Sequence, residues 1–312
     1  MVQGCTPTIG EVKAAAERIT GVVRPLTVAP AGGDLFLALE FLQHSGSFKA
    51  RGAANLLAAL LENGALPTAG ITAASGANAD LGFAWAASAF GVPATVFLAE
   101  SAPAAKVERL RELGANVRVA GETQTDAKAF AAEFMARTGA IDACAYDRNL
   151  TAAGAGTLLL ELADAVPGLD TVVLAVGAGG MFAGITAAAH HVGIRVVGAE
   201  PEGSRALNAA LAAGDVQDVT VDSIAADSLG APRVSAAALA WATAADAHSV
   251  VVGDDAIIRA RRNLWEQRRL AIEHGSATGL AALATGAYLP REGERIGVVL
   301  CGANTDPRDL VG

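Results

Sequence analysis

The sequence predicts an α/β protein of two lobes, each built on a mostly parallel sheet that helices cover on both faces. Short apolar stretches typical of buried strands alternate with stretches of helical period along most of the 312 residues. This alternation is the pattern of parallel sheets. It is interrupted once, by a loop near Ala145, and then resumes. We therefore expect a small lobe at residues 70–145 and a larger, discontinuous lobe at residues 1–69 and 146–312.

Before the interruption, capping and turn residues delimit the elements. Thr8 and Glu11 have the spacing of a capping box, which predicts a helix at 7–21. The other expected elements are a strand at 34–41, a helix at 49–64 that ends at a glycine, a strand at 70–75, a helix at 80–91, a strand at 93–99, a helix at 101–115 with a serine cap, a strand at 116–121 and a helix at 123–139.

The second series has the same character. After a loop around 146–156, we expect a helix at 157–166, a strand at 170–177, a helix at 181–193, a strand at 195–200, helices at 254–274 and 276–285, and a strand at 295–302. Ligands of open α/β sheets bind beyond the carboxyl ends of the strands. We therefore expect the functional groups just after the strands that end near Ser75, Val176 and Leu300.

Composition narrows the class of protein. A net charge of −9 and a hydrophobic share of 52% describe a globular chain with a substantial core, without the basic surface of a nucleic-acid-binding protein. No apolar run is long enough to span a membrane, and the N-terminus lacks a signal-peptide pattern. Cys5, Cys144 and Cys301 fit neither a disulfide framework nor a zinc site. We expect a cytoplasmic protein without a metal site.

Lys49 is notable because the chain has only four lysines but nineteen arginines. It opens the predicted helix at 49–64, where the positive end of the helix dipole disfavours a cation that is merely solvated. In a dry pocket the pKa of a lysine falls, and its neutral amine becomes a nucleophile and a base. A solvated surface lysine is the alternative, and the scarcity of lysine makes it less attractive.

A glycine-rich loop at 175–184 joins an apolar strand to a helix. Free backbone N–H groups at such a helix start form a cradle for phosphate. Gly177 and Gly179 begin a dinucleotide fingerprint, and Glu200 follows 23 residues after Gly177, as its acid would. Phe182, however, stands where the third glycine belongs. The motif alone therefore predicts a phosphate site and leaves the cofactor open.

Two other strand ends carry candidate groups. Ser75 and Asn78 lie on small-residue backbone that leads into a helix, and such a loop can wrap a carboxylate with N–H groups and side chains. A simple helix cap is the alternative use of these two residues. Cys301 ends the last strand, where a lone cysteine is more often a small buried apolar residue than a functional one.

Together these stretches resemble one family, the pyridoxal-phosphate enzymes of fold type II, in the branch of serine/threonine dehydratases and serine racemases. The resemblance covers almost the whole chain and implies a two-lobed homodimeric enzyme with its cofactor in the cleft. The matching stretches, in family order, are AAAERITGVVRPL, LALEFLQHSGSFKARGA, ITAASGANADLG, AAGAGTLLLEL, LAVGAGGMFAGI, VVGAEP, LWEQRRLAIEHGSATGLAAL and VVLCGAN.

The resemblance also implies a role for each candidate residue. Lys49 would hold pyridoxal 5′-phosphate as a Schiff base and remove the α-proton of the substrate. Asn78 would bond to the ring hydroxyl, and Cys301 would face the ring nitrogen. Ser75, Gly76 and the backbone up to Asn78 would bind the substrate carboxylate. The residues implied for the phosphate are Gly177, Ala178, Gly179, Gly180 and Met181.

The implied activity is that of an ammonia-lyase, which converts a small hydroxy amino acid such as L-threonine or L-serine into a 2-oxo acid and ammonia. Racemases of this branch place a serine hydroxyl opposite the lysine, one residue after the match to Ser75, and this chain has Gly76 there. We therefore expect elimination with little racemisation. The alternatives are a racemase, a 3-hydroxyaspartate ammonia-lyase, a β-replacement enzyme and a non-catalytic binding protein on the same fold.

Three departures from the family pattern affect these expectations. Ala77 and Ala79 replace the glycine and histidine of the family's S-x-G-N-H loop, which leaves the substrate preference open. Glu200 matches a cation-binding acid of many relatives, but Ala206 replaces the second acid, so a structural role is at least as well supported. Arg148 lies in a loop that the family places near the pocket, where it would pair with a second substrate carboxylate; a surface arginine is the alternative.

Overall fold

The structure, a computed structural model, describes residues 6–143 and 149–311, and their strands form two sheets. The larger sheet is built from β1 (Val28–Gly32), β2 (Leu35–Ala38), β7 (Thr171–Ala175), β8 (Arg195–Pro201), β9 (His248–Val252) and β10 (Ile296–Val299). Its strand order is β1-β2-β10-β7-β8-β9. β1 pairs with β2 antiparallel, and the other neighbouring strands are parallel.

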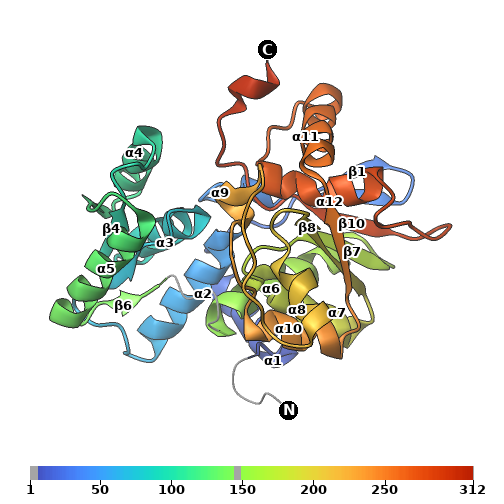
Figure 1. The fold of residues 1–312 in the computed structure, drawn as a ribbon. Helices are drawn as coiled ribbons and strands as arrows, with labels where there is room; N and C mark the ends of the chain where they lie inside the picture. The colour runs from blue at the N-terminus through green and yellow to red at the C-terminus, as the bar shows by residue number, and fades with distance from the viewer. Residues whose placement is uncertain (1–5, 144–148, 312) are drawn as a thin grey trace.

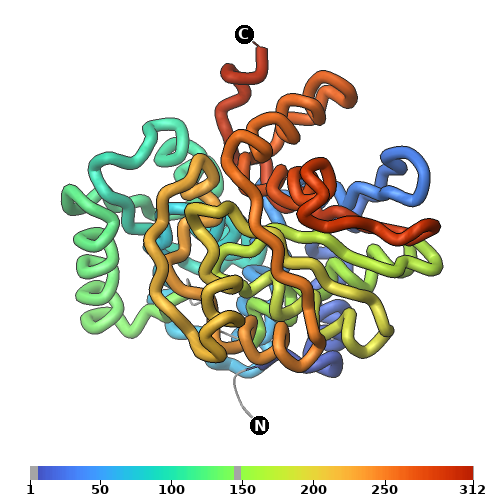
Figure 2. The backbone as a smooth tube through the Cα atoms, turned by 45° about the vertical axis from the view of Figure 1, so that its right-hand side comes forward, coloured from blue at the N-terminus to red at the C-terminus, as the bar shows by residue number. Residues whose placement is uncertain are grey.

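The smaller sheet lies within the segment predicted as the small lobe. Its strands are β3 (Ile71–Ala73), β4 (Ala94–Leu98), β5 (Asn116–Val119) and β6 (Ile141–Asp142). They are all parallel, in the order β5-β4-β3-β6. Figures 1 and 2 show this part of the chain, coloured teal to green, to one side of the larger body. The predicted α/β class is confirmed, and the lobe boundaries stay a prediction.

Helices cover both faces of each sheet. One face of the larger sheet packs against α1 (Ile9–Ile19), α6 (Asn149–Ala165), α7 (Gly180–Val192), α8 (Ala206–Ala213) and α10 (Ala236–Ala244). The other face packs against α11 (Asp254–Arg268) and α12 (His274–Ala284). The smaller sheet has α2 (Lys49–Glu62), α3 (Asn78–Phe90) and α4 (Ala104–Glu112) on one side and α5 (Gln124–Thr138) on the other. Short helical turns occupy Glu40–Leu42, Ala226–Leu229 (α9) and Pro307–Leu310.

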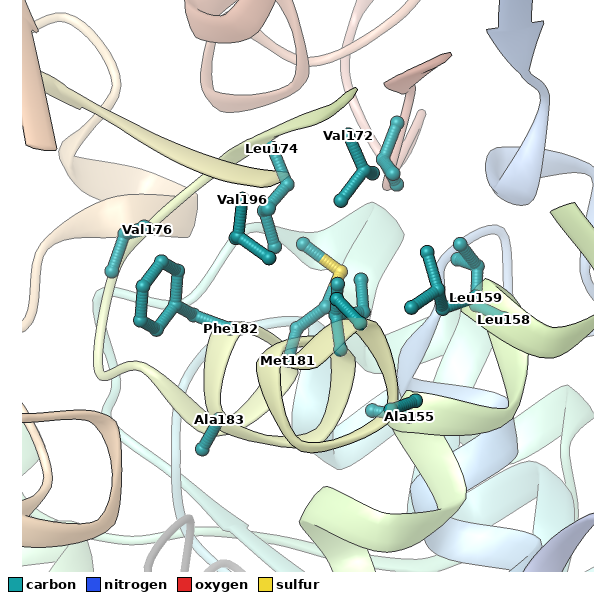
Figure 3. Packing of buried hydrophobic residues seen from close by; sticks show 14 of the residues in the cluster. Ala155, Leu158, Leu159, Val172, Leu174, Val176, Met181, Phe182, Ala183 and Val196 are labelled. Atoms are coloured by element: carbon teal, nitrogen blue, oxygen red, sulfur yellow. The ribbon is translucent and has the colours of Figure 1, made fainter. Parts of the chain in front are cut away.

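The largest apolar cluster holds the start of α7 against the sheet. In Figure 3 the side chains of Val172, Leu174 and Val196 point from β7 and β8 towards Met181 and Phe182 of α7. Val172 is fully buried and Phe182 is 1% exposed, so burial of these side chains contributes about 1.5–3 kcal/mol each. This packing fixes the turn that precedes α7 at the carboxyl end of β7.

The structure corrects several predicted boundaries. Helix α6 begins at Asn149, so the residues up to 156 are helical where a loop is predicted. Its small residues let α6 lie against α7, because a Cβ on Gly156 would sit 2.5 Å from the backbone oxygen of Gly184. Pro103, rather than Ser101, is the N-cap of α4, and no side chain caps it.

Other elements end early or are not predicted from the sequence. Helix α11 stops at Arg268, because Arg269 adopts a left-handed conformation with φ 57°. The elements β1, β6, β9, α8, α9 and α10 are absent from the prediction. No helix among the described residues has the length and apolar character needed to cross a membrane.

Candidate active site

A cavity of about 800 Å³ lies at the carboxyl ends of β3, β7 and β10. Ser75 follows β3, Gly177 follows β7 and Cys301 follows β10, and all three residues line the cavity. Lys49 lines the same cavity from the start of α2. The fold therefore brings together the lysine and the three loops that the sequence singles out.

The backbone before Lys49 is tied to the end of β10. Phe48 N–H donates to the carbonyl oxygen of Cys301 at 2.9 Å, and Ser47 forms an antiparallel bridge with Gly302. Lys49 is half-buried, and its Nζ lies 4.9 Å from the centre of the Phe48 ring. Lys49 and Cys301 therefore reach one cavity from adjoining segments of backbone.

Arg51 fixes the first turn of α2 from inside the protein. Its side chain is fully buried, and its Nε donates to Glu40 Oε1 at 2.7 Å. Its terminal nitrogens donate to Glu40, Glu161 and Thr157. Arg51 is not predicted from the sequence as functional, although the stretch SFKARGA keeps this second cation beside the lysine.

The turn from Gly177 to Met181 has the properties of an anion cradle. Gly179 has φ +88°, and a Cβ there would lie 2.5 Å from Ala238 Cβ. No side chain caps the N-terminus of α7, so the N–H groups of its first turn have no side-chain acceptor. The residues of this turn line the cavity. Thr151, on α6, lines a narrow hollow shared with Gly180 and Met181. Its buried hydroxyl has no hydrogen-bond partner within the described part of the chain.

Asn78 is oriented by two side chains that come from the other end of the chain. Its Nδ2 donates to Glu273 at 2.9 and 3.0 Å, and its Oδ1 accepts from Asn304 Nδ2 at 2.8 Å. Glu273 is 2% exposed, and burial raises the pKa of its carboxyl group. Neither Glu273 nor Asn304 is predicted from the sequence, because Glu273 lies 195 residues from Asn78.

Cys301 supplies an uncharged group to the cavity. It is 6% exposed, and its Sγ lies 3.3 Å from Ser276 Oγ. Burial and the nearby Glu273 carboxylate raise the pKa of the Cys301 thiol to about 12. The sulfur therefore stays protonated near neutral pH. The other two cysteines, Cys5 and Cys144, lie outside the described residues.

The loop from Ser75 to Asn78 lines the wall between Lys49 and α5. The N–H groups of Ser75 and Gly76 donate to the carboxylate of Asp80 at 2.9 and 2.7 Å, and Ala77 N–H donates to Ser75 Oγ at 3.0 Å. Asp80 is fully buried and is not predicted from the sequence. Its signal is its place as the third residue of α3, where an acid reaches back to backbone N–H groups.

Glu200 has a set of partners inside the protein. Its carboxylate accepts hydrogen bonds from the N–H groups of Leu207 and Asn208, both at 2.8 Å, in the first turn of α8. Burial raises the pKa of Glu200 to about 7. Glu200 therefore has a structural role, as a cap of α8. Among the described residues, no group of three or more His, Cys, Asp or Glu is placed to hold a metal ion. Arg148 lies outside the described residues.

Comparison with known proteins decides the family. A family model described as pyridoxal-phosphate dependent enzyme matches residues 15–302. The chain belongs to this family. Its cofactor is therefore pyridoxal phosphate.

Curated relatives carry related activities. The chain is 36% identical to a phenylserine dehydratase of Ralstonia pickettii, over 86% of this chain and 82% of that protein. It is 30% identical to an L-threonine ammonia-lyase of Thermotoga maritima, over 96% of this chain and 76% of that protein. Among solved structures, maize serine racemase matches with a TM-score of 0.88 at 28% identity. The match covers 98% of this chain and 96% of the maize chain. The family branch thus contains both ammonia-lyases and racemases.

Proposed function

We propose that the protein is an ammonia-lyase that eliminates water from a small hydroxy amino acid, such as L-threonine or L-serine, to give a 2-oxo acid and ammonia. The observation that carries this proposal is a lysine and a neutral thiol on adjoining backbone in one cavity, with a glycine at position 76. The proposal includes a cytoplasmic location, expected from the sequence, and a homodimer, implied by the family resemblance.

The side chains on the cavity wall fit pyridoxal phosphate. Lys49 provides the amine that holds the aldehyde, and the turn from Gly177 to Met181 provides N–H groups for the phosphate. The buried Thr151 hydroxyl, which has no partner among the described residues, supplies a further donor beside that turn. In this assignment Asn78 would hold the ring hydroxyl, and Cys301 would lie beside the ring nitrogen.

When bound, this cofactor supplies an electron sink for the bond to the α-proton of an amino acid. The protein's own part is to place and move protons. Lys49 Nζ, at the start of α2, would accept the α-proton of the substrate. The Cys301 thiol, with its pKa raised to about 12, brings no negative charge to the ring nitrogen. Cys301 would thereby leave the bound cofactor a weaker electron sink, which favours elimination over a long-lived carbanion.

Position 76 has no side chain that could carry a proton on the opposite face. Gly76 has φ +73°, and a Cβ there would lie 2.7 Å from Gln124 Oε1. The left-handed backbone at this position therefore favours glycine. The Ser75 hydroxyl is engaged by Ala77 N–H and by Asp80. These contacts support elimination over racemisation.

A larger hydroxy amino acid is a second candidate substrate for the same reaction. Ala131, Ala132 and Met135 form the cavity wall along α5, and the alanines leave room for a bulky substituent on the β-carbon. The dehydratase of Ralstonia pickettii that is 36% identical to this chain is named for phenylserine.

The test is to assay the purified holoenzyme with L-serine, L-threonine and L-phenylserine, measuring 2-oxo acid, ammonia and D-serine. We expect 2-oxo acid and ammonia in equal amounts, with little D-serine. Lys49→Ala should lose turnover entirely, whereas Lys13→Ala, a change at an exposed lysine of α1, should keep it. Substantial D-serine formation, or full activity of Lys49→Ala, would contradict the proposal.

A further inference from the structure

The loop that lines the carboxylate side of the cavity already holds a carboxylate of its own. Asp80 Oδ1 accepts from Ser75 N–H and Oδ2 accepts from Gly76 N–H, at 2.9 and 2.7 Å. The Ser75 hydroxyl also bonds to this carboxylate. Two consecutive N–H groups that converge on one anion form a backbone nest. Here the anion in the nest belongs to the protein.

Asp80 approaches the loop from the side away from the cavity. It is fully buried and does not line the cavity, whereas Ser75, Gly76, Ala77 and Asn78 all do. The N–H groups of Ser75 and Gly76 consequently point into the protein. They cannot donate to a substrate unless Asp80 gives them up, and that would leave a buried carboxylate without its donors.

Two side chains from helices beside the smaller sheet also hold this loop. Lys106, on α4, donates from Nζ to the carbonyl oxygen of Gly76. Gln124, at the start of α5, donates from Nε2 to the carbonyl oxygen of Ala74 at 2.8 Å. The loop is therefore held by one internal anion, one cation and one amide before any substrate enters.

Lys106 also balances the charges behind this wall. Its charge acts on two buried carboxylates, Asp80 and Glu273, and lowers the pKa of each against the larger effect of burial. A substrate carboxylate that docks on this wall approaches both acids. Without Lys106 it would meet uncompensated negative charge in a region of low dielectric.

We propose that Asp80 and Lys106 are positioning residues that preform the substrate-carboxylate wall. Asp80 removes the Ser75 and Gly76 N–H groups from substrate recognition, and it leaves the N–H groups of Asn78 and Ala79, at the start of α3, as the backbone donors that face the cavity. The inference rests on the proposed function insofar as the substrate is an amino acid. The inference adds two residues that affect substrate binding by holding the loop, without touching the substrate themselves.

The test compares two ligands of the holoenzyme that differ in the carboxylate, L-serine and 2-aminoethanol. Their binding is followed by the change in absorbance of the bound cofactor, a readout that needs no turnover. We expect Asp80→Asn to weaken L-serine binding about tenfold, because the amide turns an N–H group towards a loop donor that has lost its acceptor. Binding of 2-aminoethanol should change little. KM for serine should rise with little change in kcat.

Asp126→Asn is the matched control for Asp80→Asn. Asp126 is also the third residue of its helix, α5, and it accepts from the N–H of Thr123, but it is not on the cavity wall. This variant should lose some stability, as helix-cap variants do, and should bind L-serine normally. The proposal would be overturned if Asp80→Asn weakened the binding of L-serine and 2-aminoethanol equally. It would also be overturned if Asp80→Asn and Asp126→Asn bound L-serine with the same affinity.

Lys106→Met provides a second variant if Asp80→Asn does not fold. Lys106→Met should weaken the binding of L-serine more than the binding of 2-aminoethanol, whereas Lys13→Met should change neither. The double variant Asp80→Asn/Lys106→Met should be less impaired than the sum of the single changes, because charge balance is restored. Strictly additive effects of the two changes on L-serine binding would contradict the charge balance between Asp80 and Lys106. A wild-type enzyme that binds L-serine but forms no 2-oxo acid would refute the lyase function and leave this inference standing.

Discussion

Cys301 shows how one residue sets the electrostatic character of the cavity. The thiol is enclosed at the end of β10 beside Ser276, and the Glu273 carboxylate lies near enough to disfavour a thiolate. Burial acts in the same direction, so the pKa of Cys301 is raised to about 12. The residue is thus a neutral hydrogen-bonding group, although a free cysteine with an ordinary pKa near 8.5 would be partly ionised at pH 8.

The raised pKa predicts that Cys301 resists alkylation. Thiol reagents attack the thiolate, and almost none forms at Cys301 between pH 7 and pH 9. Iodoacetamide treatment of the native holoenzyme, with peptide mapping by mass spectrometry, should leave Cys301 unmodified across this range. Unfolding in guanidinium before treatment is the control and should make Cys301 fully reactive. Labelling of the native protein that rises tenfold per pH unit and saturates near pH 8 would disprove the assignment.

At the scale of single elements, buried acids hold the first turns of two helices. Arg51 and Glu40 fix the first turn of α2, which carries Lys49, by a bidentate pair at 2.7 and 3.1 Å. Glu200 caps the first turn of α8. In both cases a charged side chain is fully or almost fully buried, so each helix start is held by groups that are costly to leave unpaired.

The Glu200 cap predicts a pH-dependent contribution to stability. Burial raises the pKa of this carboxyl from 4.5 to about 7, so the folded state binds the proton more tightly than the unfolded state. The stabilisation by protonation is complete below pH 4.5 and is lost as the pH rises through about 7. The free energy of unfolding of the wild type, relative to Glu200→Gln, should therefore fall between pH 5 and pH 7.5 and then level off.

Urea titrations at several pH values measure this difference, and the subtraction removes other groups that titrate in the same range. Glu202→Gln is the control, because Glu202 is a nearby exposed acid. The difference between wild type and Glu202→Gln should be flat across the range. A flat profile for Glu200→Gln as well would contradict the assignment.

The sequence determines some parts of the site and not others for a physical reason. The positions of Lys49, Ser75 and Gly177 follow from local pattern, because each lies at the junction of a strand or loop with a helix. Asp80 also has a local signal, because its partners Ser75 and Gly76 lie five and four residues before it. Glu273 acts through Asn78, which is 195 residues away. Local periodicity contains no information about such a pairing.

The same distinction holds for the fold. The α/β class and most strands follow from alternation of apolar stretches, but the first turns of α6 do not. Residues 149–156 are mostly small and lack an apolar period, and their helix forms because Gly156 allows close contact with Gly184 of α7. Tertiary packing supplies there what local propensity lacks. Short strands such as β6, two residues long, are likewise defined by pairing in the sheet.

At the scale of the whole molecule, the cavity joins the two sheets through a few loops, so the cofactor should act as a structural link. The wall contains residues from α2 and the loop after β3, and also residues from the turn after β7 and from the end of β10. A ligand that binds only the folded state stabilises it by about 2.7 kcal/mol at 100 times its dissociation constant. Removal of the cofactor should therefore lower Tm.

The loss of stability on cofactor removal should be greatest around the cavity, and inorganic phosphate alone should restore part of it. Hydrogen exchange should increase at residues 177–181 in the apoprotein, while β9 and α11, which do not line the cavity, stay protected. Inorganic phosphate should recover part of the Tm and the protection at 177–181, because the α7 turn binds an anion. The N–H groups of Ser75 and Gly76 should stay protected with or without the cofactor, because Asp80 already accepts from them. Faster exchange of these two N–H groups in the apoprotein would show that Asp80 does not hold them and that the Asp80 assignment is wrong.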